Sequence, residues 1–269
     1  MTIRIESLDN PQLDVFRNLK AGNAVRDARL FIAEGPTVVD RVLRSDFTVQ
    51  SILISDRKWS AFESRLRPDV PVYRMANDLA DQLVGFSFHC GVLASVVRKP
   101  APAISTWMPS DGPALIIAGD RITDPENVGA LVRIASAFGA AAVVLGKGSA
   151  DPFSRRVLRV SMGNVLFMPI VETDDLSGYL STLQHERQCT VCSTVLHTDA
   201  TPLATFRFPE RTVLVFGNEY DGISPRHQAI AGIELTIPML NGTDSLNVAV
   251  SAGIFAHQYR SQFPVHAAR

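Results

Sequence analysis

The sequence predicts an α/β protein with two domains, the second built on a mostly parallel sheet. Three observations support this prediction: a length of 269 residues, apolar segments of strand length that alternate with helical patterns, and a proline-rich break near residue 100. At roughly 100–200 residues per domain, this length corresponds to about two domains. Alternating strands and helices favour parallel pairing, because each crossover helix then covers a face of the sheet.

The break between the domains is placed at residues 100–112, which are rich in proline, alanine and serine. This composition is typical of turns and linkers. We therefore expect a first domain over residues 1–99, a linker over 100–112 and a second domain over 113–269.

The first domain is expected to be a small α/β unit. Apolar residues at helical spacing predict a helix over Pro11–Lys20, and the apolar run Leu30–Ala33 predicts a strand. Pro36 is well suited to begin the next helix, because the first turn does not need its missing N–H. Ser51–Ile54 and Cys90–Val97 are predicted as further strands.

The second domain alternates strands and helices more clearly. Val128, Leu131, Val132 and Ala135 form the inward face of one helix. In parallel sheets ligands bind at loops beyond the carboxyl ends of the strands, so the polar, glycine-rich segments after the strands are the expected place for chemistry. Strands are predicted over Ala114–Ala118, Ala141–Leu145, Val165–Ile170, Gln188–Ser193, Val213–Phe216 and Ile233–Ile237, and helices over Val128–Phe138, Pro152–Val160 and Leu246–Gln258.

Composition excludes several classes of protein. Hydrophobic residues make up 46% of the chain and charged residues 20%, which argues against wholesale disorder. No apolar run approaches the roughly 18 residues of a membrane span, and the start of the chain lacks the hydrophobic stretch of a secretory signal. Three cysteines are too few for a disulfide framework, so we expect a cytoplasmic protein without a membrane partner.

The net charge of the whole chain does not indicate a nucleic-acid partner. Lysine and arginine total 26 against 27 acidic residues, whereas nucleic-acid-binding domains are usually basic. Any RNA-binding surface must therefore be a local patch. Arg155, Arg156 and Arg159 recur near helical spacing, and they form either a basic stripe for RNA or an ordinary solvated helix face.

The first segment that differs from an ordinary turn is Asp124–Ala130, which leads into a helix that carries Arg133. Asn127 is of the type that caps helices, and this structural role is as plausible as a functional one. Arg133 lies in a helix of mostly small and apolar residues, where a guanidinium is either solvated or a specific anion contact.

Two further segments follow strands in the same way. In Gly217–Gly222 two glycines flank acidic residues. Ser224 and Pro225 are typical of the start of a helix, but a helix start does not explain why residue 217 is a glycine. The third segment combines Ile237–Met239 with Ser245–Val248 and enters a helix of small residues, which suits a loop, a helix cap and close packing by another element.

Together and in this order, the three segments resemble the signature motifs of the SpoU-type (TrmH-like) RNA 2′-O-ribose methyltransferases of the SPOUT superfamily. The resemblance covers about residues 113–262. The first domain is similar, more loosely, to the L30e-like substrate-binding domain often fused ahead of such enzymes. That second resemblance is carried by Phe31–Gly35 and His89–Ala94.

The resemblance implies an α/β sheet with a deep C-terminal trefoil knot, which the usual rules of chain threading would exclude. It also implies a homodimer, with the knot and the closing helix at the interface. The methyl donor is S-adenosylmethionine (AdoMet), and no metal is expected. By position, Gly217, Ile237 and Leu246 would line the adenosyl pocket, with Met239 beside them.

The implied reaction transfers a methyl group from a sulfonium to a ribose 2′-hydroxyl. By resemblance, Arg133 is the central catalytic residue, surrounded by Asn127, Glu219, Ser245 and Asn247. A guanidinium stays protonated in proteins, so a phosphate clamp is physically easier for Arg133 than the role of a base. We assign Glu219 to holding Arg133 or a backbone amide, and the other side chains to fixing the loop or binding polar atoms.

The expected partner is RNA, with ribosomal RNA preferred over transfer RNA by analogy with the L30e-like domain. DNA is not expected, because it lacks the 2′-hydroxyl. The alternatives are a transfer RNA methyltransferase and a non-catalytic RNA-binding protein. A nicotinamide enzyme would need a G-x-G-x-x-G loop, which is missing. A redox or metal pair at Cys189 and Cys192 is disfavoured, because residues three apart in a strand face opposite sides.

Overall fold

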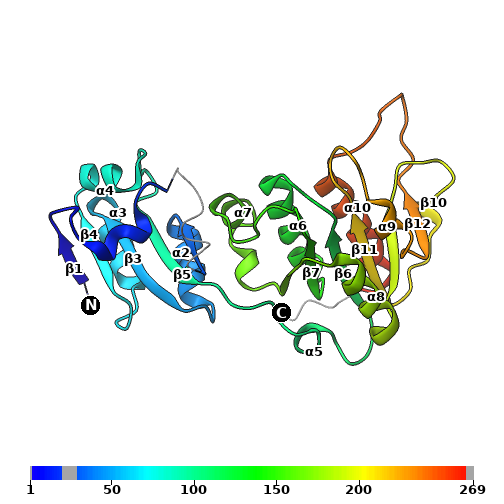
Figure 1. The fold of residues 1–269 in the computed structure, drawn as a ribbon, viewed down its shortest axis with the longest axis horizontal. Helices are drawn as coiled ribbons and strands as arrows, with labels where there is room; N and C mark the ends of the chain where they lie inside the picture. Colours follow the sequence, from blue (N-terminus) through cyan, green and yellow to red (C-terminus); the bar gives the residue numbers. More distant parts are fainter. Residues whose placement is uncertain (1, 20–28, 265–269) are drawn as a thin grey trace. The chain divides into compact units, whose positions relative to one another are not determined.

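The computed structural model describes residues 2–19 and 29–264, which form two compact units (Figure 1). Unit 1 comprises the chain up to Pro100 together with Phe153–Phe167, and unit 2 comprises the rest. The segment Phe153–Phe167 therefore groups with unit 1, although we expected it within the second domain. Residues 101–112, expected as a linker, group with unit 2 and contain a short helix.

Unit 1 is a five-stranded sheet with helices. Its strand order is β1-β4-β3-β5-β2, in which β5 runs antiparallel to both of its neighbours and the other pairs are parallel. The predicted strands in this part are confirmed, and the helix expected over Pro11–Lys20 is a shorter 3-10 helix, with Lys20 outside the described residues. The strands are β1 (Thr2–Ile5), β2 (Leu30–Glu34), β3 (Val49–Ser55), β4 (Val72–Met75) and β5 (Val92–Val97), and the helices before Pro100 are η1 (Pro11–Phe16), α2 (Pro36–Arg44), α3 (Asp56–Phe62), η2 (Glu63–Arg65) and α4 (Asn77–Val84).

The segment Phe153–Phe167 packs against the rest of unit 1 through aromatic rings and arginine side chains. It contains helices α7 (Arg155–Val160) and η3 (Asn164–Leu166). The Phe153 ring lies 5.1 Å from the Phe31 ring, centroid to centroid. Arg155 pairs with Glu34 at 2.9 Å, so this arginine is engaged inside unit 1 and is not part of a freely solvated stripe.

The strand predicted over Val165–Ile170 is wrong. Gly163 has a φ of +77°, and this left-handed residue turns the chain into η3 rather than into extended structure. Val165 and Leu166 are nevertheless buried, and their apolar side chains therefore resembled those of a buried strand. The strand itself, β8 (Ile170–Thr173), begins at the last residue of the predicted range.

Unit 2 contains a seven-stranded sheet in which every pair of neighbours is parallel. Its order is β10-β12-β9-β11-β6-β7-β8, which confirms the predicted parallel α/β class. Besides β8 the strands are β6 (Ala114–Gly119), β7 (Ala142–Gly146), β9 (Thr190–Thr194), β10 (Thr201–Pro202), β11 (Arg211–Phe216) and β12 (Ile233–Thr236), and the helices are α5 (Ile104–Trp107), α6 (Pro125–Ala137), α8 (Leu176–Arg187), η4 (Leu203–Thr205), α9 (Pro225–Gln228) and α10 (Val248–Gln262).

Helices cover both faces of this sheet. On one face Leu180 of α8 belongs to the same buried cluster as Val191 and Val213. On the other, Phe216 of β11 meets Phe255 of α10 edge to face, with the ring centroids 5.9 Å apart. The helices α6 and α10 pack against each other, and Arg260 of α10 donates hydrogen bonds to backbone carbonyls just beyond α6. The Phe216–Phe255 contact joins the end of β11 to the middle of α10, and Arg260 joins the last turn of α10 to the end of α6.

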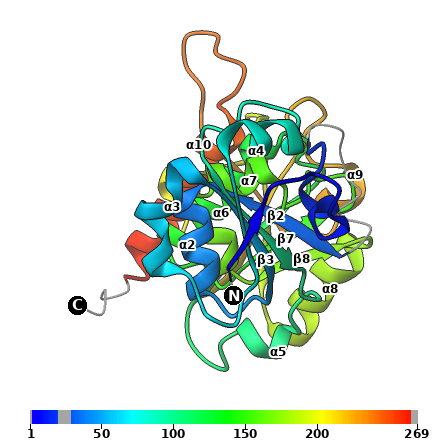
Figure 2. The same cartoon turned by 90° about the vertical axis from the view of Figure 1, so that its left-hand side faces the viewer.

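The segment between β12 and α10, residues 237–247, stands out from the body of unit 2 in both views (Figures 1 and 2). Most of its residues are exposed. A turn within it is closed by a hydrogen bond from the Thr243 N–H to the Leu240 carbonyl. Across the described ranges, no helix is long and apolar enough to cross a membrane.

Candidate active site

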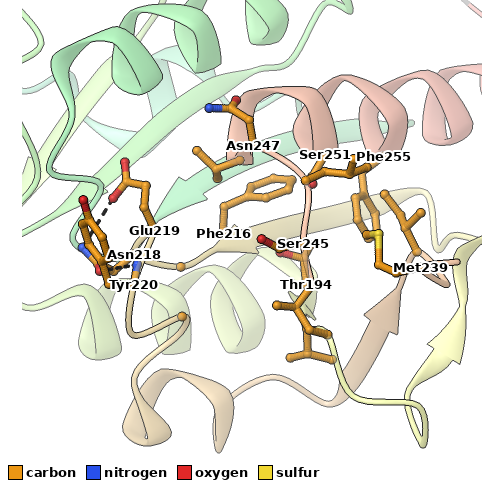
Figure 3. Close-up of a pocket in the computed structure, with 17 residues that line it drawn as sticks. Thr194, Phe216, Asn218, Glu219, Tyr220, Met239, Ser245, Asn247, Ser251 and Phe255 are labelled. Carbon is orange, nitrogen blue, oxygen red and sulfur yellow. Dashed lines mark hydrogen bonds between the residues drawn. The ribbon is translucent and has the colours of Figure 1, made fainter. Parts of the chain in front are cut away.

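A pocket of about 270 Å³ lies in unit 2 where three parallel strands end. Its walls come from the residues that follow β9, β11 and β12 and from the first turns of α10 (Figure 3). Carboxyl ends of parallel strands meet at one edge of a sheet, which is where ligands bind in open α/β folds. Phe216 and Phe255 give the pocket an apolar part, and backbone and short polar side chains surround it.

The pocket brings together seven of the nine predicted site residues. The other two, Asn127 and Arg133, lie on α6 and do not line it. The seven are Gly217, Glu219, Ile237, Met239, Ser245, Leu246 and Asn247.

The turn Gly217–Gly222 is closed by two backbone hydrogen bonds between Asn218 and Gly222, each 3.0 Å long. A Cβ atom at Gly217 would lie 2.2 Å from the Gly222 carbonyl carbon and from the Ile223 nitrogen. Both atoms belong to the backbone, so neither can swing aside. The close approach of two backbone segments therefore explains why residue 217 is a glycine. The helix start at Ser224 and Pro225 did not explain it.

Glu219 is anchored by donors from the loop that follows β6 and from the first turn of α6. Its carboxylate accepts a hydrogen bond from the Asn127 side-chain amide at 2.8 Å and longer ones from the backbone N–H groups of Thr123 and Asp124. Burial raises the pKa of Glu219, but these hydrogen bonds, led by that of Asn127, outweigh burial and lower the pKa below its ordinary value. Glu219 is thus an ionised acceptor that holds backbone amides, and its hydrogen-bond partners do not include Arg133.

Asn127 joins the three predicted segments. Its side-chain nitrogen donates to Glu219, and its side-chain oxygen accepts from the Asn247 amide at 2.9 Å. Asn247 in turn accepts the Ala249 N–H and caps α10. The interpretation of Asn127 as a helix cap is wrong: Asp124 caps α6, because it accepts the Glu126 N–H at 2.8 Å. Asn127 is 7% exposed and spans the gap between two loops instead.

A second connection between the loops was missed by sequence reasoning. The Asp120 carboxylate, 1% exposed, accepts the Ser224 N–H and hydroxyl, both at 2.7 Å, and lies 2.9 Å from His227 Nδ1. Burial raises the pKa of Asp120, but the hydrogen bonds from Ser224 and His227 outweigh it and lower the pKa. The one available signal was the position of Asp120 directly after a strand.

Further pocket residues were also missed, because the loop after β9 carries no motif. Thr194, the last residue of β9, and Leu196 in the loop line the pocket, and Ser251 lines it from α10. Their signal was topological: β9 is a neighbour of β11, so its carboxyl end reaches the same edge.

Arg133 lies exposed on α6, away from the pocket of its own chain. In the part of the chain that the structure describes, no hydrogen bond or ion pair occupies its guanidinium. Arg133 is thus available to a ligand or to another molecule. The same described ranges contain no group of three or more His, Cys, Asp or Glu side chains placed to hold a metal ion.

The sequence matches a family of known proteins. The model of the SpoU rRNA Methylase family matches residues 114–257. An uncharacterized tRNA/rRNA methyltransferase of Mycobacterium tuberculosis is 34% identical over 254 residues, covering 91% of this chain and 87% of that protein. The 23S rRNA (guanosine(2553)-2′-O)-methyltransferase RlmP of Bacillus subtilis is 29% identical, covering 96% of this chain and 99% of its own.

Solved structures show the same fold. The SpoU methyltransferase AviRb from Streptomyces viridochromogenes, in complex with AdoMet, superposes with a TM-score of 0.82 at 23% identity. The match covers 94% of this chain and 99% of that one. An AdoMet-bound rRNA methyltransferase from Sinorhizobium meliloti superposes with a TM-score of 0.81 at 24% identity, covering 98% and 99% of the two chains.

Proposed function

Because the chain belongs to the SpoU rRNA methylase family, we propose that it transfers a methyl group from AdoMet to a ribose 2′-hydroxyl of RNA. The observation that carries this proposal is the convergence of Gly217, Ile237 and Leu246 on one pocket. In addition, two solved structures of the same fold are described as AdoMet complexes, and RlmP is named for 2′-O-methylation of 23S rRNA.

The residues of the pocket fit the proposed methyl donor. Phe216, Phe255 and Leu246 offer apolar walls for an adenine ring, and the bare backbone at Gly217 allows close approach. Glu219 places an ionised carboxylate on the pocket wall, which favours a positively charged ligand. AdoMet supplies an electrophilic methyl group on a cationic sulfur.

The protein's own residues then position the acceptor. We propose that Arg133 clamps a phosphate of the RNA and stabilises the developing alkoxide, since a guanidinium stays protonated. The O–CH3 bond forms as the S–CH3 bond breaks, the donor leaves as the neutral thioether, and the 2′-hydroxyl proton passes to water. Glu219, Asn127 and Asn247 form one hydrogen-bonded chain that fixes the pocket wall. Ser245, which lines the pocket, contributes a polar group for donor or substrate.

We propose that the protein acts as a homodimer. Arg133 does not line the pocket of its own chain, and we infer that the Arg133 of a second copy serves this pocket. The exposed face of α10 supports such an interface: Val250 and Ile254, four residues apart, leave 51% and 39% of their surface in water. Small residues on α6 and α10 favour close packing of helices, as the resemblance implies.

The remaining expectations stay proposals. Ribosomal RNA is preferred over transfer RNA as the substrate, with unit 1 as the L30e-like RNA-binding part. The C-terminal trefoil knot and a cytoplasmic location also stay predictions. Transfer RNA is the second candidate substrate, because relatives are named tRNA/rRNA methyltransferases.

The test is a map of ribose methylation in the RNAs of the source organism, with and without the gene. We expect one 2′-O-methyl mark in ribosomal RNA to disappear with the gene, and the purified protein to restore it on an unmodified transcript with AdoMet. A mark lost from transfer RNA instead would favour the second candidate. RNA binding without calorimetric heat for AdoMet would contradict the proposal and favour a non-catalytic RNA-binding protein.

A further inference from the structure

We propose that the Tyr220 ring is the platform on which a base of the substrate RNA stacks beside the methyl-transfer pocket. This inference rests on the proposed RNA methyltransferase function. It assigns a substrate-positioning role to a residue that the motif resemblance leaves unassigned.

Tyr220 is exposed to an unusual degree. Its side chain keeps 92% of its surface in water, the highest value among the exposed large hydrophobic residues that the structure describes. Yet it lines the pocket and follows Glu219 directly. In the described ranges no aromatic ring or cation packs on its face. The ring sits on a loop at the pocket rim, where loops carry binding residues, and a ligand that extends out of the pocket can contact it.

The backbone beneath the ring is rigid. The Asn218 side-chain oxygen accepts the N–H groups of Tyr220 and Asp221 at 2.9 and 3.1 Å. The Asn218 side-chain nitrogen donates to the Arg121 carbonyl at 2.8 Å, and the backbone of Asn218 pairs with Gly222. Since the turn is fixed and a tyrosine has few side-chain torsions, stacking on this ring costs little conformational entropy.

The ring lies at the end of the pocket where an acceptor nucleotide has access. Figure 3 shows Tyr220 beside Asn218 and Glu219 at one end, with Met239 and Phe255 at the other. If the apolar end holds the adenine of the donor, the end that carries Tyr220 is left for the RNA.

Charge around Tyr220 favours a base over a phosphate. Glu219 and Asp221 flank it, and the nearby cation, Arg121, is already paired with Asp221 at 3.2 Å. A phosphate would be repelled here, whereas an uncharged base would not. Stacking of unpaired bases on aromatic side chains is a general mode of single-stranded RNA recognition. The geometry therefore favours a target nucleotide that is unpaired.

The test compares Tyr220→Ala, Tyr220→Phe and wild type on an unmodified 23S rRNA transcript that the wild type methylates. Loss of one stacked base is expected to raise the KM for RNA about tenfold. The maximal rate and the calorimetric Kd for AdoMet should change less than about twofold, because the turn beneath the ring is intact. Tyr220→Phe should behave as wild type. Tyr220→Phe is also the matched control, since it keeps the ring and removes only the hydroxyl group.

Three results would overturn the inference. An unchanged KM in Tyr220→Ala would show that the ring does not contact RNA. A weaker AdoMet affinity in that variant would assign the ring to the donor, and loss of activity in Tyr220→Phe would assign the role to the hydroxyl group. Absence of methylation by the wild type on any RNA is a different outcome, because it refutes the proposed function itself.

A photo-crosslinking residue at position 220 gives an independent readout. We expect benzoylphenylalanine at this position to crosslink within a few nucleotides of the methylated ribose. Crosslinks only at distant sites would contradict stacking near the target.

Discussion

The pocket should not tolerate a methyl group at Gly217, although this residue has an ordinary backbone conformation. In Gly217→Ala the new Cβ would lie 2.2 Å from two backbone atoms, against an ordinary contact distance of at least 3.4 Å. The Gly222–Ile223 backbone would have to retreat by about 1.2 Å. Movement of that size breaks the paired hydrogen bonds between Asn218 and Gly222.

The cost can be estimated from these contacts. Two backbone hydrogen bonds contribute about 1 kcal/mol each, and residual overpacking adds about 1 kcal/mol. Opening the turn relieves the clash, so the sheet should stay folded while the pocket loses its shape. If binding of the donor requires the closed turn, about 3 kcal/mol corresponds to an AdoMet affinity about 100-fold weaker.

Gly222→Ala is the matched control. Gly222 lies in the same turn, but an alanine there is disfavoured for a different reason. Gly222 has a φ of +69°, but a Cβ there would meet no atom within 4 Å. The expected cost is only the left-handed backbone of a non-glycine residue, about 1 kcal/mol, or about fivefold in affinity.

Isothermal titration of AdoMet into wild type and both variants measures these effects, and thermal unfolding reports whether the fold persists. The reasoning fails if Gly217→Ala binds AdoMet within about threefold of wild type. It also fails if Gly222→Ala is the more damaged of the two.

Three other predictions concern Arg133, the buried carboxylate and the proposed interface. Arg133→Lys keeps the charge but loses the planar fork, so methylation should fall about 100-fold or more while AdoMet affinity stays unchanged; near wild-type turnover would reject the clamp. Asp120→Asn should cost about 2 kcal/mol in urea unfolding at pH 7. Because folding lowers the pKa of Asp120, its contribution is present above about pH 4 and is lost as the pH falls further, so the wild type and the variant should converge in acid; a constant difference would contradict this. Val250→Glu should give monomers in light scattering and abolish activity without weakening AdoMet binding, whereas an active monomer would refute the need for a second copy.

Much of the pocket could be predicted from the sequence, because its position follows from topology. Apolar runs located β6, β11 and β12, and the ends of parallel strands share one edge. Polar segments after all three strands were therefore expected to meet. Gly217, Ile237 and Leu246 do line one pocket.

The partners of individual side chains could not be predicted in the same way. Asn127 and Glu219 are 92 residues apart, and Asp120 and Ser224 are 104 apart, so no local pattern reports these contacts. Local chemistry even misled at Asn127, since a cap-forming residue type near a helix start is the commoner explanation. A solvated position was one of the two interpretations of Arg133, but helical spacing does not say which exposed residue meets a second molecule.

The misplaced strand has a similar cause. Val165 and Leu166 are buried and apolar, as strand residues are, and hydrophobicity alone does not distinguish a strand from a single helical turn. The decisive residue was Gly163, whose left-handed backbone redirects the chain.

The two walls of the pocket differ in how they are held. Residues 217–222 are tied to the loop after β6 before any ligand arrives. Residues 237–246 instead project from unit 2 between β12 and Asn247, which is held by Asn127 at the start of α10. When AdoMet binds, the loss of conformational entropy should therefore occur almost wholly in the projecting segment, because the other wall is already fixed. We expect that segment to open and close over the bound donor. The rate at which it opens should then set how long the demethylated donor stays bound.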